Sequence, residues 1–226
     1  MNKFGSTSSL ARNYDLAAST YELTGHLFST GQIRAAKFVQ LDWIEPNSKL
    51  LYLGCGTGEE VVAAAARGFQ VTAVDISREM LIRLEKRLYT RGLSAELFNE
   101  SVFEFEPNTK FDAVAANFFF NIFFGDDLNR VIQCALSFLE PTGSLLVADV
   151  ALPRGIWPAR AFNWCYINSA QLLASFAGLV KLHRNHDYLA IFNSLDCEIV
   201  RCDYFRFCRV GPILFQSLQV RSLASN

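Results

Sequence analysis

The chain of 226 residues predicts an α/β domain with a doubly wound, mostly parallel sheet of seven strands. Three observations predict it. Between Leu50 and Val150 short apolar runs alternate with amphipathic stretches, a glycine turn joins the first run to a helical pattern, and the C-terminal segment alternates apolar and polar residues. Strands that alternate with helices are typical of βαβ units, whose right-handed crossovers place helices on both faces of the sheet.

The central region supplies five of the expected strands. They lie near residues 49–54, 70–74, 94–98, 111–116 and 143–149. The helices between them are expected near residues 58–67, 78–91 and 127–139. In the second helix Met80, Leu81, Leu84 and Leu88 share one face, and Ser77 is placed to cap its start.

We interpret residues 1–226 as one domain, because a chain of this length with 51% hydrophobic residues can bury one sizeable core. Residues 1–45 are expected to form an N-terminal helical cap. Residues 46–150 form the core, and residues 151–226 add a substrate-side helix and a terminal hairpin.

The segments outside the core have their own patterns. In the cap, helical periodicity is interrupted between Ser29 and Gly31, which predicts two helices. After the core, a long helix is expected over residues 159–182 and another near His186. The final segment favours two strands joined at Gly211-Pro212, a turn dipeptide, and this hairpin would give the parallel sheet an antiparallel edge.

Composition excludes several classes of protein. The 21 basic and 22 acidic residues lack the excess of positive charge that nucleic-acid binding requires. The six cysteines form no C-x-x-C pair and the chain opens without the apolar core of a signal peptide, so we expect a cytoplasmic location. No apolar stretch reaches the roughly 18 to 20 residues of a transmembrane helix. The 20 phenylalanines fill a core, line a pocket or face lipid, which leaves peripheral membrane contact open.

Residues 50–60, LLYLGCGTGEE, lead from a strand through three glycines into a helix. Such a turn presents backbone N–H groups at the carboxyl edge of a parallel sheet. A P-loop would need lysine followed by serine or threonine, and a dinucleotide fingerprint starting at Gly54 would need glycine where Glu59 stands. Glu59 and Glu60 would repel a pyrophosphate, so a neutral or cationic nucleoside fits better.

Residues Leu50–Gly58 resemble motif I of the class I, Rossmann-like methyltransferases that depend on S-adenosylmethionine (SAM), whose usual form is V-L-D-x-G-C-G-x-G. Later segments fit the same family in order. VTAVDIS ends in Asp75, DISREML resembles D-x-S-x-x-M-L, and FDAVAANFFFNIF and LEPTGSLLVAD resemble the fourth and fifth strands. The resemblance implies SAM as the cofactor and S-adenosylhomocysteine as the product.

The resemblance also implies which residues contact SAM. Asp75 is expected to accept hydrogen bonds from the ribose hydroxyls, Ile76 and Met80 to lie near the adenine, and Asn117 and Phe118 near the methionyl part. The full expected set is Tyr21, Tyr52, Gly54, Cys55, Gly56, Gly58, Asp75, Ile76, Met80, Ser101, Val102, Asn117 and Phe118.

Two positions depart from the family pattern. Tyr52 replaces the usual acidic residue of motif I, and Ser101 replaces an aspartate that usually receives the adenine amino group. The Tyr52 phenol can still make one hydrogen bond, and its ring could attract the sulfonium by roughly 0.5 to 2 kcal/mol. Glu59 or Tyr21 could replace the missing acceptor. The two departures leave open a non-catalytic partner with a degenerate pocket, and a SAM-fold enzyme of elimination or cyclisation.

The chemistry needs few catalytic groups. A sulfonium makes the methyl group electrophilic, so the protein aligns the acceptor and excludes water, and a base is needed only for a protonated acceptor. The candidate bases are His186, beside Asp187, and His26 in the cap, with a solvated histidine as the alternative. His183 and His186 have helical spacing without a third ligand, so no metal is expected.

Aromatic residues follow the fourth and fifth strands, where this fold binds its acceptor. They favour a hydrophobic or aromatic small molecule held mainly by shape, with O- or C-methylation favoured, although core packing also accounts for such rings. The expected wall residues are Phe119, Phe120, Trp157 and Trp164. The N-terminal Y-D-x-x-A-x-x-Y segment and the long late helix loosely resemble the methyltransferases of ubiquinone and menaquinone synthesis. The sequence leaves monomer or homodimer open.

Overall fold

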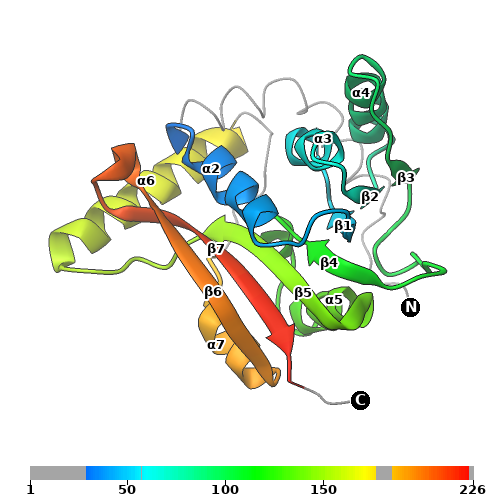
Figure 1. The fold of residues 1–226 in the computed structure, drawn as a ribbon. Coiled ribbons are helices and arrows are strands. Elements are labelled where there is room, and N and C mark those ends of the chain that lie inside the picture. The colour runs from blue at the N-terminus through cyan, green and yellow to red at the C-terminus, as the bar shows by residue number, and fades with distance from the viewer. Residues whose placement is uncertain (1–28, 57, 177–184, 224–226) are drawn as a thin grey trace, which may run out of the picture.

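A computed structural model describes residues 29–56, 58–176 and 185–223 (Figure 1). Its seven strands form one sheet in the order β3-β2-β1-β4-β5-β7-β6. The strands are β1 Lys49–Leu53, β2 Gln70–Val74, β3 Glu96–Phe98, β4 Phe111–Ala115, β5 Leu139–Val150, β6 Cys197–Arg206 and β7 Ile213–Ser222. The first five pair in parallel and the last two antiparallel, which confirms the predicted fold class.

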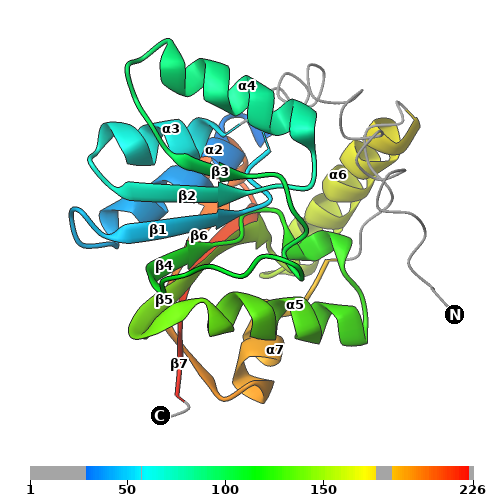
Figure 2. The same ribbon diagram turned by 90° about the vertical axis from the view of Figure 1, so that its right-hand side faces the viewer.

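The helices form two layers around this sheet. Their bounds are α2 Gln32–Phe38, α3 Glu59–Ala66, α4 Arg78–Tyr89, α5 Asp126–Ser137, α6 Trp157–Phe176 and α7 Tyr188–Ser194, with 3₁₀ turns η1 Val39–Asp42, η2 Phe120–Ile122 and η3 Phe207–Arg209. Figure 2 shows α3 and α4 on one face of the sheet and α5 and α7 on the other, with α6 beyond the end of the parallel strands. No helix in these described segments is long and apolar enough to cross a membrane.

The side chains of β1 divide between the two layers because successive residues of a strand point to opposite faces. Leu51 and Leu53 belong to the core cluster with Phe120, Ile132 and Tyr188, on the side of α5 and α7. Leu50 and Tyr52 belong to the cluster on the side of α3 and α4. Position 52 is therefore fixed by strand alternation beneath α3.

The predicted cap of α4 is confirmed, and α7 has a side-chain cap that the sequence analysis did not predict. Ser77 caps α4 by accepting a hydrogen bond from the Met80 amide at 3.3 Å, and the predicted face of α4 is buried. Asp187 caps α7 through the Ala190 amide at 3.2 Å, so this helix starts two residues after His186.

Some details of the fold differ from the expected ones, and some expected elements lie outside the described residues. β5 begins at Leu139, four positions early, because Leu139 pairs with Phe111 ahead of an irregularity in the β4–β5 register. β7 inserts between β5 and β6, which makes β6 the antiparallel edge of the sheet. The first half of the expected cap, with Tyr21 and His26, and the expected end of α6 lie outside the described residues.

Candidate functional site

The glycine turn after β1 lies at the carboxyl edge of the parallel strands. Gly54, Gly56 and Gly58 have φ of 64°, 52° and 72°, a region that residues with a Cβ atom rarely adopt. These angles reverse the chain within a few residues, so that α3 begins at Glu59. The turn therefore needs glycine for its conformation, whatever it binds.

Asp75 ties this turn to the start of α4. Its Oδ2 accepts a hydrogen bond from the Gly56 amide at 3.0 Å, and its Oδ1 accepts one from the Ser77 amide at 2.9 Å. The Asn99 side-chain amide donates to the backbone carbonyls of Asp75 and Ile76, both at 3.0 Å. Asp75 thus holds the glycine turn against the start of α4.

The space beside the three glycines differs. A Cβ at Gly54 would lie 2.3 Å from the Phe119 ring, and one at Gly58 would lie 2.5 Å from Leu84 of α4. A Cβ at Gly56 would meet nothing within 4 Å. The open side of the turn is therefore at Gly56, whereas the Phe119 ring covers Gly54.

Asn117 follows β4 and is buried. Its Oδ1 accepts a hydrogen bond from the Ala148 amide at 2.9 Å, but its Nδ2 has no hydrogen-bond partner. An unpaired buried N–H donor costs about 1 to 3 kcal/mol, which a bound acceptor atom would offset. The neighbouring Phe118 has φ of 52° and packs its ring against Phe215.

Tyr52 lies in the core beneath α3. Its hydroxyl donates to the Glu60 carbonyl at 3.4 Å, and burial raises its pKa well above the usual value, with a further contribution from the charge of Glu60. The Glu60 carboxylate is buried and pairs with Lys37 of α2 at 2.9 Å, whereas Glu59 is exposed and pairs with Arg34 at 3.5 Å. Lys37 was not identified from the sequence as a partner of Glu60, because it lies in no recognisable motif.

The remaining predicted cofactor residues occupy ordinary structural positions. Burial, followed by the charge of Asp75, raises the pKa of the Cys55 thiol, so it stays neutral. Met80 and Val102 are buried, and Ile76 is half-buried. The Ser101 hydroxyl accepts a hydrogen bond from the Phe103 amide at 3.3 Å within a turn.

Asp149, near the end of β5, forms a buried polar cluster that the sequence did not predict as a site. The Tyr188 hydroxyl donates to its Oδ2 at 2.5 Å, and the Asn121 amide to its Oδ1 at 3.2 Å. Burial raises the pKa of Asp149 to about 6, against the opposing effect of these hydrogen bonds. The acidic end of LLVAD was the only local signal, because its partners lie elsewhere in the sequence.

His186 lies beside this cluster. Its Nε2 is 3.1 Å from the Phe123 carbonyl, and its ring contacts those of Tyr188 and Phe124, each with centroids 5.8 Å apart. A carbonyl only accepts hydrogen bonds, so Nε2 carries the proton and Nδ1 is the basic nitrogen of the neutral ring. The structure thus brings His186 together with Asp149 and Tyr188.

The four residues expected to form the acceptor wall differ in burial. Phe119 is half-buried and packs against Phe120 and Phe123, with centroids 5.8 and 5.3 Å apart, whereas Phe120 is fully buried in the core. Trp157 and Trp164 are largely exposed on α6, so they are not enclosed as pocket walls would be. In the described segments no cluster of three His, Cys, Asp or Glu side chains could hold a metal ion.

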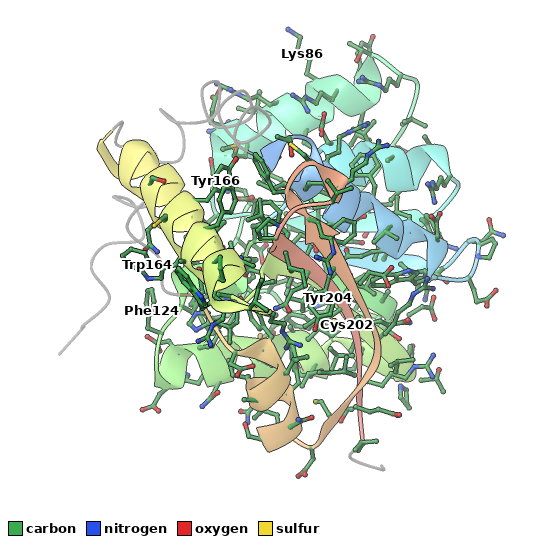
Figure 3. The ribbon with its side chains drawn as sticks, turned by 90° about the vertical axis from the view of Figure 1, so that its left-hand side faces the viewer. Lys86, Phe124, Trp164, Tyr166, Cys202 and Tyr204 are labelled. Atoms are coloured by element: carbon green, nitrogen blue, oxygen red, sulfur yellow. The ribbon has the colours of Figure 1, made fainter. Side chains whose placement is uncertain are left out.

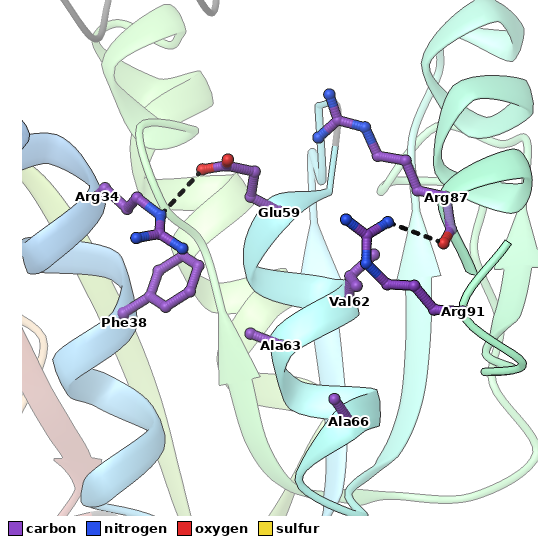
Figure 4. Close-up of a pocket in the computed structure, with 8 residues that line it drawn as sticks. All are labelled: Arg34, Phe38, Glu59, Val62, Ala63, Ala66, Arg87 and Arg91. Atoms are coloured by element: carbon purple, nitrogen blue, oxygen red, sulfur yellow. Dashed lines mark hydrogen bonds and ion pairs between the residues drawn. The ribbon is translucent and has the colours of Figure 1, made fainter.

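A cavity of about 280 Å³ lies between α2, α3 and α4 (Figure 4). Arg34, Arg87 and Arg91 surround a floor that includes Ala63 and Ala66. None of the predicted cofactor residues lines it. The glycine turn and this cavity are therefore separate features of the structure.

The different surroundings of the glycines predict different costs of substitution. Gly56→Ala should destabilise the protein by about 1 to 2 kcal/mol through backbone strain alone. Gly54→Ala should cost about 1 to 3 kcal/mol more because its Cβ meets the Phe119 ring. Urea denaturation measures both, and adding Phe119→Ala should recover the extra cost only in the Gly54 variant. Equal costs for the two glycines would show that the ring does not cover Gly54.

The raised pKa of Asp149 predicts a pH dependence of stability. Between its ordinary value of 3.8 and about 6, the folded state holds a proton that the unfolded state has lost. Stability relative to Asp149→Asn should therefore decrease by up to about 3 kcal/mol as the pH rises through this window. Urea denaturation at several pH values tests this, with the exposed Asp112→Asn as control. A pH-independent difference would contradict it.

Known proteins resemble this chain in sequence and in fold. Residues 50–143 match the family model described as a methyltransferase domain. A probable thiol methyltransferase 2 of Arabidopsis thaliana is 32% identical over 139 residues, which cover 60% of this chain and 55% of that protein. The ubiquinone/menaquinone biosynthesis C-methyltransferase UbiE of Desulfotalea psychrophila is 29% identical over 161 residues, 68% of this chain and 63% of that protein.

The chain spans 32% to 63% of the length of the curated relatives it matches. Among solved structures, the complex of DhpI with S-adenosylhomocysteine aligns over 99% of this chain and 100% of that one, with a TM-score of 0.70 and 20% identity, which shows a shared fold. The ordered motifs, the matched family model and this fold agree. Together they support a class I, Rossmann-like SAM-dependent methyltransferase that is loosely related to the ubiquinone/menaquinone group.

Proposed function

We propose that this protein transfers a methyl group from SAM to a hydrophobic or aromatic small molecule, by O- or C-methylation. The observation that carries the proposal is the arrangement of Asp75, the glycine turn and Asn117 at one sheet edge. The Asp75 carboxylate holds the amide of Gly56, beside which a Cβ would meet nothing, and a buried amide N–H at Asn117 lacks an acceptor. These groups fit a nucleoside with hydroxyls at one end and acceptor atoms at the other.

Bound SAM supplies the electrophilic methyl group. Asp75 would accept hydrogen bonds from the ribose hydroxyls, and Asn117 Nδ2 would donate to an acceptor atom of the cofactor. The Phe119 ring against Gly54 would have to shift or form a wall, since it lies over the same turn. Tyr52 lies beneath α3, the helix that follows the glycines. Its hydrogen bond to the Glu60 carbonyl and the ion pair of Glu60 with Lys37 would fix the first turn of this helix.

The acceptor would bind between the residues that follow β4 and those that precede α7. Phe119 and Phe123 provide half-buried apolar surface there, which excludes water and favours a ring over a charged group. His186 is the proposed base for an acceptor that arrives protonated, because the Phe123 carbonyl fixes the Nε2 proton and leaves Nδ1 basic. Asp149 and Tyr188 would position its ring.

Asp75→Ala tests the cofactor site. SAM binding should weaken by about 1 to 3 kcal/mol because the ribose hydroxyls lose their acceptor. Calorimetric titration with SAM measures this. The matched control is Asp112→Ala, since Asp112 also accepts a backbone hydrogen bond, from Lys49 at 2.8 Å, but outside the site. Thermal unfolding without ligand shows whether each variant folds, and unchanged affinity in a folded Asp75→Ala variant would overturn the placement of the ribose.

Turnover tests the reaction itself. Incubation of the protein and SAM with fractions of hydrophobic metabolites should yield S-adenosylhomocysteine and a product heavier by one methylene, both measured by mass spectrometry. Product without S-adenosylhomocysteine would favour elimination or cyclisation. No heat on titration of folded protein with SAM would favour a non-catalytic partner.

A further inference from the structure

The N-terminal half of α6 and the turn between β6 and β7 carry a surface that the cofactor site does not use. Ile156, Trp157, Trp164 and Val210 are exposed by 75%, 79%, 63% and 88%. Four exposed arginines accompany them in the same segments: Arg154, Arg160, Arg206 and Arg209. We call these eight residues the tryptophan face. Apolar side chains this exposed are seldom grouped on a protein surface without a partner.

The geometry of α6 turns both tryptophans away from the protein. Trp157 and Trp164 are seven residues apart, which places them on one side of a helix. Asn163 and Ile167 of the same helix are buried. Figure 3 labels Trp164 together with Tyr166, which comes from the side of α6 that contacts the hairpin turn.

The two segments of the face are fixed to each other. The rings of Phe162 and Tyr166 pack against Phe207 in the hairpin turn, with centroids 5.3 and 5.2 Å apart. The Asn163 amide also donates a hydrogen bond to the Ile213 carbonyl. These contacts anchor α6 on the turn, so the exposed residues of the two segments keep fixed positions relative to each other.

The face is positively charged although the chain as a whole is not. Residues 150–186 and 204–222 contain no aspartate or glutamate, whereas the whole chain has a formal net charge of -1. A second copy of the chain in a symmetric contact would place these arginines against each other, which costs free energy. An anionic surface matches the charge, and one with an apolar interior also matches the tryptophans.

The face lies beyond the edge of the sheet that holds the candidate cofactor site. α6 follows the carboxyl end of β5, and Figure 2 shows it past the ends of the parallel strands. No helix in the described part of the chain can span a bilayer, so α6 would lie along a membrane surface and not across it.

We propose that the tryptophan face binds the surface of an anionic lipid bilayer, with the two tryptophans in the interfacial layer and the arginines on lipid phosphates. Membrane binding of this kind needs no cofactor and no methyl transfer. It would bring the carboxyl edge of the sheet close to a lipophilic acceptor dissolved in the bilayer, and this last link alone rests on the proposed function.

Vesicle binding tests the proposal with the full chain. Trp43→Phe leaves only two of the three tryptophans, Trp157 and Trp164, to report by fluorescence. This change should be tolerated because the Trp43 indole N–H is buried without a partner. Vesicles of phosphatidylcholine with about a third phosphatidylglycerol should bind the protein and shift its emission to the blue, and added salt should weaken binding. Vesicles of phosphatidylcholine alone should bind at least fivefold less.

Paired variants separate the face from the rest of the surface. Trp157→Ala/Trp164→Ala and Arg206→Glu/Arg209→Glu should each reduce sedimentation with anionic vesicles at least fivefold. Tyr89→Ala and Lys86→Glu, both exposed on α4, should leave it unchanged. Circular dichroism confirms folding of each variant. Three results would overturn the proposal: no binding to anionic vesicles, binding that the paired variants do not reduce, or a dimer in sedimentation equilibrium that the tryptophan variant dissociates.

Discussion

The carboxylate of Asp75 is the constraint on which the site depends, because it joins the glycine turn after β1 to the start of α4. One oxygen holds the Gly56 amide in the turn after β1, and the other holds the Ser77 amide at the start of α4. Three glycines with positive φ would give that turn many conformations in isolation. The carboxylate selects one of them and fixes it against the start of α4, so the turn has this conformation before a ligand arrives.

The parts of the fold that have local signals could be predicted from the sequence. β1, β2 and α4 follow from apolar periodicity and from Ser77, signals contained within a few residues. The early start of β5 could not be predicted, because it arises where Leu139 pairs across the sheet with Phe111. Periodicity describes one segment at a time and carries no register between two segments.

The candidate site shows a similar division. The spacing of the motifs identified Asp75 as a candidate residue. In the structure its carboxylate is hydrogen-bonded to the glycine turn. Asn99 and Asp149 were missed because their partners lie far along the chain: Asn99 bonds the carbonyl of Asp75, and Asp149 accepts from Tyr188. Trp157 illustrates a different difficulty, because its ring is largely exposed. Its ring was expected to line a pocket, but sequence alone cannot distinguish an apolar side chain that faces a cavity from one that faces solvent.

Tyr52 shows why one departure from the family pattern is tolerated. Strand alternation directs position 52 beneath α3, next to Glu60, whose charge contributes to raising the pKa of the Tyr52 phenol. Glu60 is buried and has Lys37 as its cation at 2.9 Å. An aspartate at position 52 would add a second carboxylate to this buried space, and like charges in a low-dielectric interior repel strongly. Tyrosine at this position donates a hydrogen bond to the Glu60 carbonyl and adds no charge. The buried carboxylate of this region therefore belongs to Glu60 of α3 and not to a residue of β1.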